Sequence, residues 1–263
     1  HVSTNMDAPR LLNIAPMHKY IPPQIEYKYG AKSRYVEINS IANNNQRKSI
    51  FLGTGHSNIF HLDLNTLKLI DELKEHQDYI LDLSINSESN LLTSASHDGT
   101  LKVWSLASSN HGKSIVSFND DKKSNEYYTN CCDLHENGRF AAAGYGHKTD
   151  DKRNQICLYE LNMMTCIFTE ANSENHYIPQ VVKFSNVWKR SHQSNLSMMV
   201  GYNNCNLSVF DPNYSHSNHG KQQCDQLKIR SSSKSIWSIR FQKHYDMAVI
   251  CGTSNCIDLV ANT

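Results

Sequence analysis

One short pattern recurs five times along the chain, and its spacing constrains the fold more than any other feature of the sequence. Each copy has a small residue, a polar turn and then a run rich in β-branched and aliphatic residues. The clearest copy is Thr93–Leu106, and the others begin at Gly53, Gly144, Gly201 and Gly252. Successive copies begin 40 to 57 residues apart, a spacing near that of repeats that each form one small β-sheet. One such sheet cannot bury both faces alone, so we expect the sheets to pack on one another in a single all-β domain.

The second copy resembles a WD repeat. His76, Ser94 or Ser96, Asp98 and Trp104 match the hydrogen-bonded tetrad of that repeat, in which His stands between a carboxylate and a hydroxyl and the indole N–H closes the chain. A Ser-His-Asp hydrolase triad uses the same residue types. The resemblance favours a structural tetrad and implies a WD40 β-propeller, which we expect to have seven blades in the full protein, about five of them recognisable here.

Strand and linker signals divide the chain in the same way. In the second blade, alternating apolar and polar residues predict strands over 79–85, 90–96, 100–106 and 114–118. In the fourth blade, the polar insertion 213–223 predicts a surface loop. Residues 1–33 contain four prolines and predict an extended arm or a partial blade. Residues 34–263 are predicted to form the propeller, as a fragment whose last blade is incomplete.

The composition limits the partners. Lys and Arg number 26 against 25 Asp and Glu, so the formal net charge of +1 gives no general attraction to nucleic acid or to a membrane. A basic stretch, 228–243, leaves nucleic acid as an accessory contact only. Eight cysteines without a CxxC pair indicate a reducing compartment. With no visible signal peptide or apolar span, we expect a nuclear protein, with the cytosol as the alternative.

We expect neither a metal nor a cofactor. The best metal candidates are His216, His219 and Cys224, but a structural zinc site wants four ligands. Aromatic residues are a stronger signal, because the turns of a WD propeller gather on one face. The rim residues expected there are Tyr35, His56, Tyr79, His97, Tyr128, Tyr145, Tyr177 and Trp237. Rings at a channel mouth can anchor a peptide or cage a methylated ammonium group by cation–π attraction.

A more specific resemblance lies near the end of the chain. The segment 235–241 followed by 247–252 resembles a late blade of the embryonic ectoderm development (Polycomb) family, and 75–83 and 90–94 agree with the family in the same order. The family implies a non-catalytic scaffold that holds the methyltransferase subunit of Polycomb repressive complex 2 and reads trimethyl-lysine on the histone H3 tail. By carry-over, Tyr35 and Trp237 resemble two walls of its aromatic cage. Ser238 stands where the family usually has Tyr, and Arg240 follows in the same segment.

Two other classes of protein remain open. A generic WD40 adaptor, such as a ubiquitin-ligase substrate receptor or another nuclear assembly scaffold, is expected to have Arg soon after the Trp of a repeat, whereas Trp104 is followed by Ser-Leu-Ala. An enzyme would need carboxylates or metal ligands converging on the central channel, and no such set recurs at the inner positions of the repeats. We therefore expect a protein that binds other proteins and has no catalytic residues.

Overall fold

The computed structural model describes residues 26–29, 32–88, 90–107, 112–119, 124–150, 153–171, 177–185, 196–218, 221–231, 234–242, 247–253 and 257–261. The chain forms two compact units, His1–Val36 and Glu37–Thr263. In the first unit, β1 (Glu26–Tyr29) and β2 (Lys32–Tyr35) make an antiparallel hairpin. The rest of the arm expected over 1–33 lies outside the described residues. The second unit contains all of the repeats.

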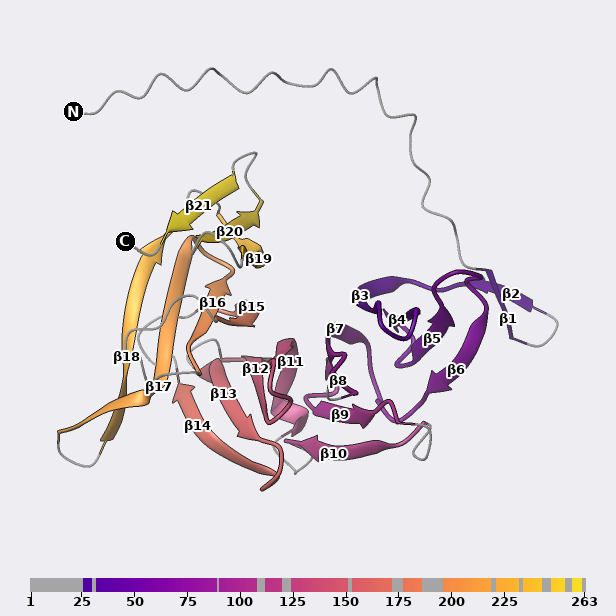
Figure 1. Ribbon diagram of the computed structural model, residues 1–263. Coiled ribbons are helices and arrows are strands. Elements are labelled where there is room, and N and C mark those ends of the chain that lie inside the picture. The colour runs from indigo at the N-terminus through magenta and orange to yellow at the C-terminus, as the bar shows by residue number, and fades with distance from the viewer. Residues whose placement is uncertain are drawn as a thin grey trace, which may run out of the picture. The chain divides into compact units, whose positions relative to one another are not determined.

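The second unit consists of five antiparallel sheets that follow one another in chain order (Figure 1). Four have four strands and the last has three. The fold is therefore the all-β, five-bladed arrangement that the repeats predict, while the full count of seven blades stays a prediction. The strands are β3 (Ile38–Asn44), β4 (Ser49–Thr54), β5 (Ile59–Asp63) and β6 (Leu69–Leu73); β7 (Ile80–Asn86), β8 (Leu91–Ser96), β9 (Leu101–Ser105) and β10 (Ser114–Phe118); β11 (Tyr127–Leu134), β12 (Phe140–His147), β13 (Gln155–Glu160) and β14 (Thr165–Ala171); β15 (Pro179–Phe184), β16 (Met198–Tyr202), β17 (Asn206–Asn218) and β18 (Lys221–Arg230); and β19 (Ile236–Gln242), β20 (Met247–Gly252) and β21 (Ile257–Ala261).

One expected loop is instead a hairpin. The polar insertion 213–223 of the fourth blade extends β17 and β18, which stay paired from Ser215↔Cys224 to Asn218↔Lys221 after a register shift. A ladder needs only backbone donors and acceptors, so a polar sequence does not prevent it. The loop prediction was wrong because it read polarity as the end of a strand.

Apolar clusters between neighbouring sheets hold the blades together. Phe51 and Ile59 of the first blade pack on Ile80, Leu92 and Trp104 of the second, and similar clusters join each later pair of sheets. Full burial of one such side chain contributes about 1.5–3 kcal/mol. Each pair of neighbouring sheets is therefore held together by its own apolar cluster.

The small residues of the repeat pattern have a steric cause. A Cβ at Gly53 would lie 2.6 Å from Ile80 Cγ2, and one at Gly201 would lie 2.5 Å from Ile236 Cγ2. Ile80 and Ile236 are the first residues of the next blade's innermost strand. The pattern therefore marks the place where one blade touches the next.

Candidate functional site

Each innermost strand has one extra residue at an equivalent place. The pairing with the second strand shifts between Ile38 and Ser40 in the first blade and between Ile236 and Ser238 in the fifth, and the other three blades show the same shift. Such a bulge re-aims the side chain of the extra residue. The five extra residues are Asn39, Leu81, Asn130, Gln180 and Trp237.

These five residues line one cavity of about 290 Å³. Its walls also include Asp82, Lys183, Ser238 and Arg240, so the cavity draws on the innermost strand of every blade. It is the central channel of the five-bladed unit. The sequence reasoning found Trp237 but missed the other four bulge residues. No residue type marks these positions in the sequence, because Asn, Leu, Gln and Trp all occur at them.

Two carboxamides of the channel tie neighbouring blades together. Asn39 Nδ2 donates to the Ile80 carbonyl oxygen at 3.0 Å, and Asn130 Nδ2 donates to the Pro179 carbonyl oxygen at 2.7 Å. Each bond fixes the orientation of the amide, and the amide oxygen of each residue remains a hydrogen-bond acceptor for a ligand. The channel wall is thus polar and fixed in position.

Three of the four predicted peptide-binding residues meet at this cavity. Trp237 is 63% exposed, and its indole N–H donates to Ser235 Oγ at 3.0 Å, which fixes the edge of the ring and leaves its surface open. Ser238 and Arg240 lie on the same strand, and one Arg240 guanidinium nitrogen donates to the Ile239 carbonyl oxygen. The side chain of Tyr35 lies outside the described part of the structure.

Three charged groups beside the channel, Asp82, Asp133 and Lys183, join neighbouring blades. Asp82 accepts the backbone N–H of Cys132 of the next blade at 3.0 Å. Asp133 accepts the backbone N–H of Phe184 and forms an ion pair of 2.7 Å with Lys183. Burial raises the pKa of Asp82. Burial alone would lower the pKa of Lys183, but the charges of Asp133 and Asp82 raise it, so this lysine keeps its charge.

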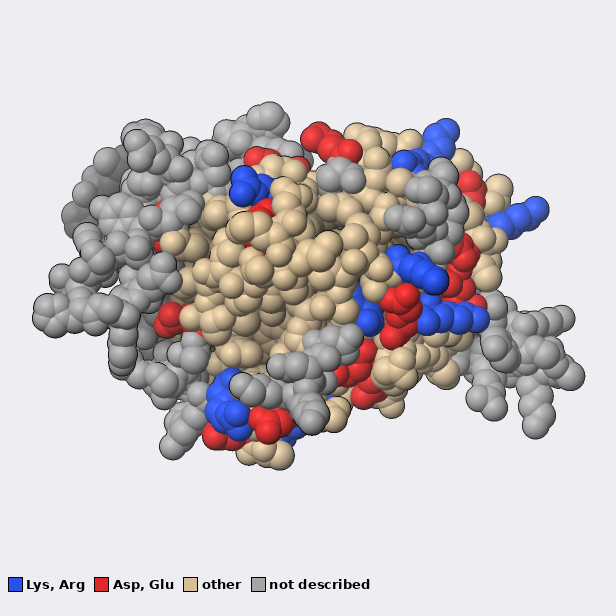
Figure 2. Space-filling model, turned by 90° about the horizontal axis from the view of Figure 1, so that it is seen from below, with Lys and Arg blue, Asp and Glu red and all other residues tan. Residues whose placement is uncertain are grey.

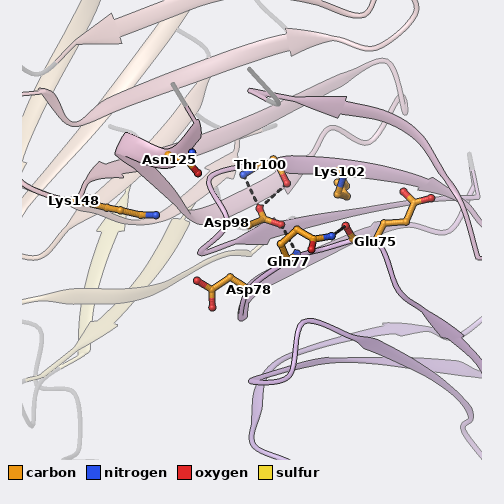
Figure 3. A pocket seen from close by; sticks show the side chains of 8 residues that line it. All are labelled: Glu75, Gln77, Asp78, Asp98, Thr100, Lys102, Asn125 and Lys148. Carbon is orange, nitrogen blue, oxygen red and sulfur yellow. Dashed lines mark hydrogen bonds between the residues drawn. The ribbon is translucent and has the colours of Figure 1, made fainter. Parts of the chain in front are cut away.

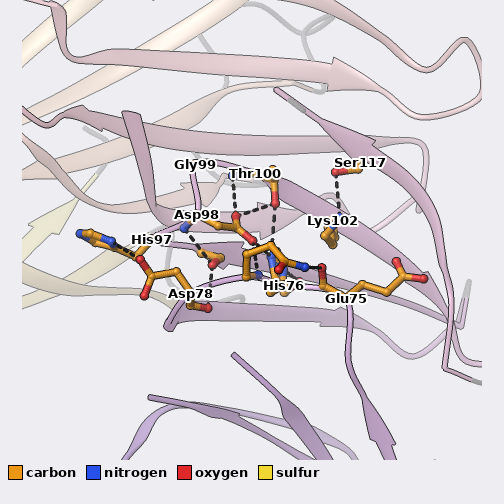
Figure 4. Close-up of polar contacts among 12 residues, drawn as sticks. Glu75, His76, Asp78, His97, Asp98, Gly99, Thr100, Lys102 and Ser117 are labelled. Atoms are coloured by element: carbon orange, nitrogen blue, oxygen red, sulfur yellow. Dashed lines mark hydrogen bonds and ion pairs between the residues drawn. The ribbon is translucent and has the colours of Figure 1, made fainter. Parts of the chain in front are cut away.

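The tetrad residues lie in one hydrogen-bonded chain, of which Figure 4 shows His76 and Asp98. His76 Nδ1 lies 2.7 Å from Asp98 Oδ2, His76 Nε2 lies 2.7 Å from Ser94 Oγ, and Trp104 Nε1 donates to Ser94 Oγ at 2.9 Å. Ser94, not Ser96, is therefore the serine of this chain. Burial alone would raise the pKa of Asp98, but hydrogen bonds and the charge of His76 lower it well below its usual range.

A second hollow, of about 380 Å³, lies beside the tetrad (Figure 3). Its lining includes Asp98, Asp78 and Lys148. Asp78 binds His97 Nδ1 at 2.8 Å, and the His97 ring stacks on Tyr128 with a centroid distance of 5.4 Å.

The structure corrects one expected member of the rim. Tyr145 is fully buried, and its hydroxyl group lies 2.7 Å from the Tyr159 hydroxyl group. Its side chain therefore belongs to the core and not to the rim, because strand alternation points it into the face between the second and third blades.

No group of three or more His, Cys, Asp or Glu side chains in the described part of the chain is placed to hold a metal ion. The candidates His216, His219 and Cys224 have side chains outside that part. Among the described residues, no helix has the length and apolar character that crossing a membrane requires.

Comparison with known proteins agrees with the fold. Residues 67–105 match the WD domain, G-beta repeat family. The match runs from the last strand of the first blade to the third strand of the second, so it includes the loop that carries His76. The chain therefore contains a WD40 repeat within a five-bladed β-propeller arrangement.

The chain is also similar to THO complex subunit 6 of Arabidopsis thaliana. The two are 30% identical over 112 residues, which is 43% of this chain and 30% of the relative. The matched part of the chain thus spans less than a third of the length of that relative.

Proposed function

We propose that this protein is a non-catalytic scaffold subunit of a nuclear multiprotein complex, and that it binds a peptide segment of a partner at the mouth of the central channel. One observation carries the proposal: five equivalent bulges line a single cavity, and one of the bulge residues is the exposed Trp237. Exposed aromatic residues beside fixed polar groups are typical anchors for a bound peptide. WD40 propellers generally bind protein partners.

The chemistry of the channel supports binding over catalysis. General acid–base catalysis needs a group that is free to exchange a proton with a substrate. Asp82 and Asp133 already accept backbone N–H groups of the next blade, and Lys183 is paired with Asp133. These charged groups connect neighbouring blades. On the face shown in Figure 2, acidic and basic side chains are interspersed around an uncharged centre, which favours a protein partner over nucleic acid.

The particular partner that we propose is a histone H3 tail carrying trimethyl-lysine, in a complex like Polycomb repressive complex 2. The open face of the Trp237 indole suits a methylated ammonium group, and the amide oxygens of Asn39 and Asn130 suit the peptide that carries it. Ser238 provides no second ring, so the affinity rests on fewer aromatic walls than in the family that the sequence resembles.

A second candidate is a subunit role in a complex of the kind named for the Arabidopsis relative. The 30% identity over 112 residues favours it. In that case the same mouth would bind a segment of another subunit, and trimethylation of a lysine would not change the affinity.

The test is a titration of labelled H3 tail peptides, unmethylated and trimethylated, followed by fluorescence anisotropy. Loss of a desolvated cation–π contact of about 2 kcal/mol weakens binding about 30-fold, which is the effect expected for Trp237→Ala. Trp237→Phe should retain part of the affinity. Tyr79→Ala is the control, since Tyr79 is 53% exposed and, although the sequence predicts it at the rim, it does not line the channel. Equal binding of both peptides, or no binding, would reject the histone reader and leave the second candidate.

A further inference from the structure

Two cysteines of the third blade share one face of the sheet because of a β-bulge. Cys157 on β13 pairs with Thr169 of β14, and Tyr159 pairs with Cys166, with a register shift between the two pairs. Cys166 and Thr169 are three residues apart, so in a regular strand their side chains would point to opposite faces. The extra residue of the bulge turns Cys166 onto the face of Thr169 and Cys157.

A single hydroxyl group bridges the two sulfurs. Thr169 Oγ1 lies 3.6 Å from Cys157 Sγ and 3.3 Å from Cys166 Sγ. The hydroxyl can donate to a charged sulfur, so it can stabilise a thiolate that lies beside a thiol. In its protonated form the Cys166 thiol instead donates to the Phe168 carbonyl oxygen at 3.2 Å.

The environments of the two sulfurs determine which one carries the negative charge of the thiolate. Cys166 is exposed on the outermost strand of its sheet, whereas Cys157 is buried. The hydrogen bond from the Cys157 thiol, together with that from Thr169, lowers the pKa of Cys166 to about 6. The same bond to Cys166, and then burial, raise the pKa of Cys157. The proton of the pair therefore stays on the buried sulfur, and the accessible sulfur is the nucleophile.

We propose that Cys166 is a peroxide-reactive thiol and that Cys157 is its resolving thiol, so that the pair forms a reversible disulfide across β13 and β14. The Cys166 thiolate attacks one oxygen of hydrogen peroxide, the O–O bond breaks, and the products are a sulfenic acid and hydroxide. The Cys157 sulfur then attacks the sulfenic sulfur, and the S–O bond breaks as the S–S bond forms. The released hydroxyl group takes up the Cys157 proton and leaves as water.

The position of the pair makes the second step feasible. The two cysteines are diagonal neighbours on adjacent strands. The Cα atoms of diagonal neighbours are slightly farther apart than the Cα atoms of most disulfide-bonded cysteines. β14 is the last strand in its sheet and has a bulge at this point, so the closer approach that a disulfide needs takes place at the edge of the sheet. The reduced and oxidised forms would then differ at the outer edge of the third blade.

The other described thiols of this blade provide an internal contrast. Cys131 and Cys132 lie on the innermost strand and are fully buried, and burial raises the pKa of both. Both should stay unreactive in the folded protein. Reaction confined to Cys166 would therefore reflect its site and not general oxidation.

The test begins with alkylation of the folded protein by iodoacetamide across a pH series, which needs no variant. Cys166 should reach half its maximal rate near pH 6, the pKa of its thiol, while Cys131 and Cys132 stay unmodified. The protein is next treated with hydrogen peroxide, its free thiols are blocked, and it is cleaved with chymotrypsin. Cleavage after Tyr159 separates Cys157 from Cys166, so only a disulfide keeps their peptides together until a reductant is added.

Three variants complete the experiment. Cys166→Ser and Cys157→Ser should both abolish the linked peptides, and Cys157→Ser should let dimedone trap the sulfenic acid at Cys166. Cys251→Ser, at a partly exposed cysteine of another blade, should leave the disulfide unchanged. Circular dichroism checks that each variant is folded. Half-maximal alkylation of Cys166 near the ordinary thiol range, or peroxide treatment that gives no linked peptides from the folded protein, would overturn the proposal.

Discussion

Removal of one hydroxyl group, by Ser94→Ala, should destabilise the protein far more than its size suggests. Ser94 Oγ accepts from Trp104 Nε1 at 2.9 Å and lies 2.7 Å from His76 Nε2. All three residues are buried, so no water can replace the hydroxyl group. Alanine at this position leaves the indole N–H and one imidazole nitrogen without a partner inside the second blade.

The magnitude follows from these two groups. A buried polar group that loses its partner costs about 1–3 kcal/mol, so the two together cost about 2–6 kcal/mol. The whole stability of a domain is about 5–15 kcal/mol, and the variant should therefore unfold at a much lower urea concentration. Ser105→Ala is the matched control, because Ser105 Oγ accepts one long bond of 3.3 Å from the Ala107 N–H and is partly exposed.

A double-mutant cycle with Trp104→Phe tests the reasoning directly. Phenylalanine has no indole N–H, so Ser94→Ala should cost about 1–3 kcal/mol less in that background than in the wild type. Urea unfolding followed by far-ultraviolet circular dichroism provides the four free energies. If Ser94→Ala costs no more than Ser105→Ala, or if the two tetrad substitutions are additive, the chain of buried bonds does not carry the stability assigned to it.

Two further predictions concern pH and packing. The folded-state pKa of Asp98 is lowered from 3.8, so this carboxylate stabilises the folded protein above that pH, and the stabilisation is lost as the pH falls below it. Thermal unfolding should show a fall in Tm below about pH 4, and the fall should be smaller in Asp98→Asn. The pKa of Lys183 is raised from 10.5, so this lysine stabilises the folded protein below that pH, and the stabilisation is lost as the pH rises above it. The Tm should therefore fall at alkaline pH, and Lys183→Met should remove this fall. Gly201→Ala should cost about 1–3 kcal/mol in urea unfolding, because the new Cβ meets Ile236 Cγ2 at 2.5 Å. Gly55→Ala should cost less, because its nearest neighbour is the flexible Glu37 side chain; equal costs would show that the contact between blades is not the cause.

The sequence predicted those features that depend on residues within one repeat. The tetrad of the second blade is such a feature, because His76, Asp98 and Trp104 have fixed places in the repeat. The small residues at Gly53 and Gly201 are another, although their steric role became clear only from the neighbouring blade. Patterns that lie within one strand and one turn can be predicted from the sequence alone.

Features that depend on register were missed for a physical reason. A bulge changes which face a side chain takes, and nothing in the residue types of β14 announces one, so the meeting of Cys157 and Cys166 was not foreseen. The five bulges of the innermost strands were missed in the same way, and with them the place of Asn39 and Asn130 in the channel. Tyr145 was expected on the rim because the repeat pattern places a turn after Gly144, whereas β12 continues to His147 and keeps Tyr145 within the sheet.

The central claim is that a partner's peptide binds at the channel mouth beside Trp237. The most direct measurement is a peptide array that carries histone tails, methylated and unmethylated, together with scrambled sequences, probed with the wild-type protein, Trp237→Ala and Tyr79→Ala. The account predicts that peptides bound by the wild type are bound by Tyr79→Ala and lost with Trp237→Ala. A set of bound peptides that is the same for the wild type and Trp237→Ala would contradict it.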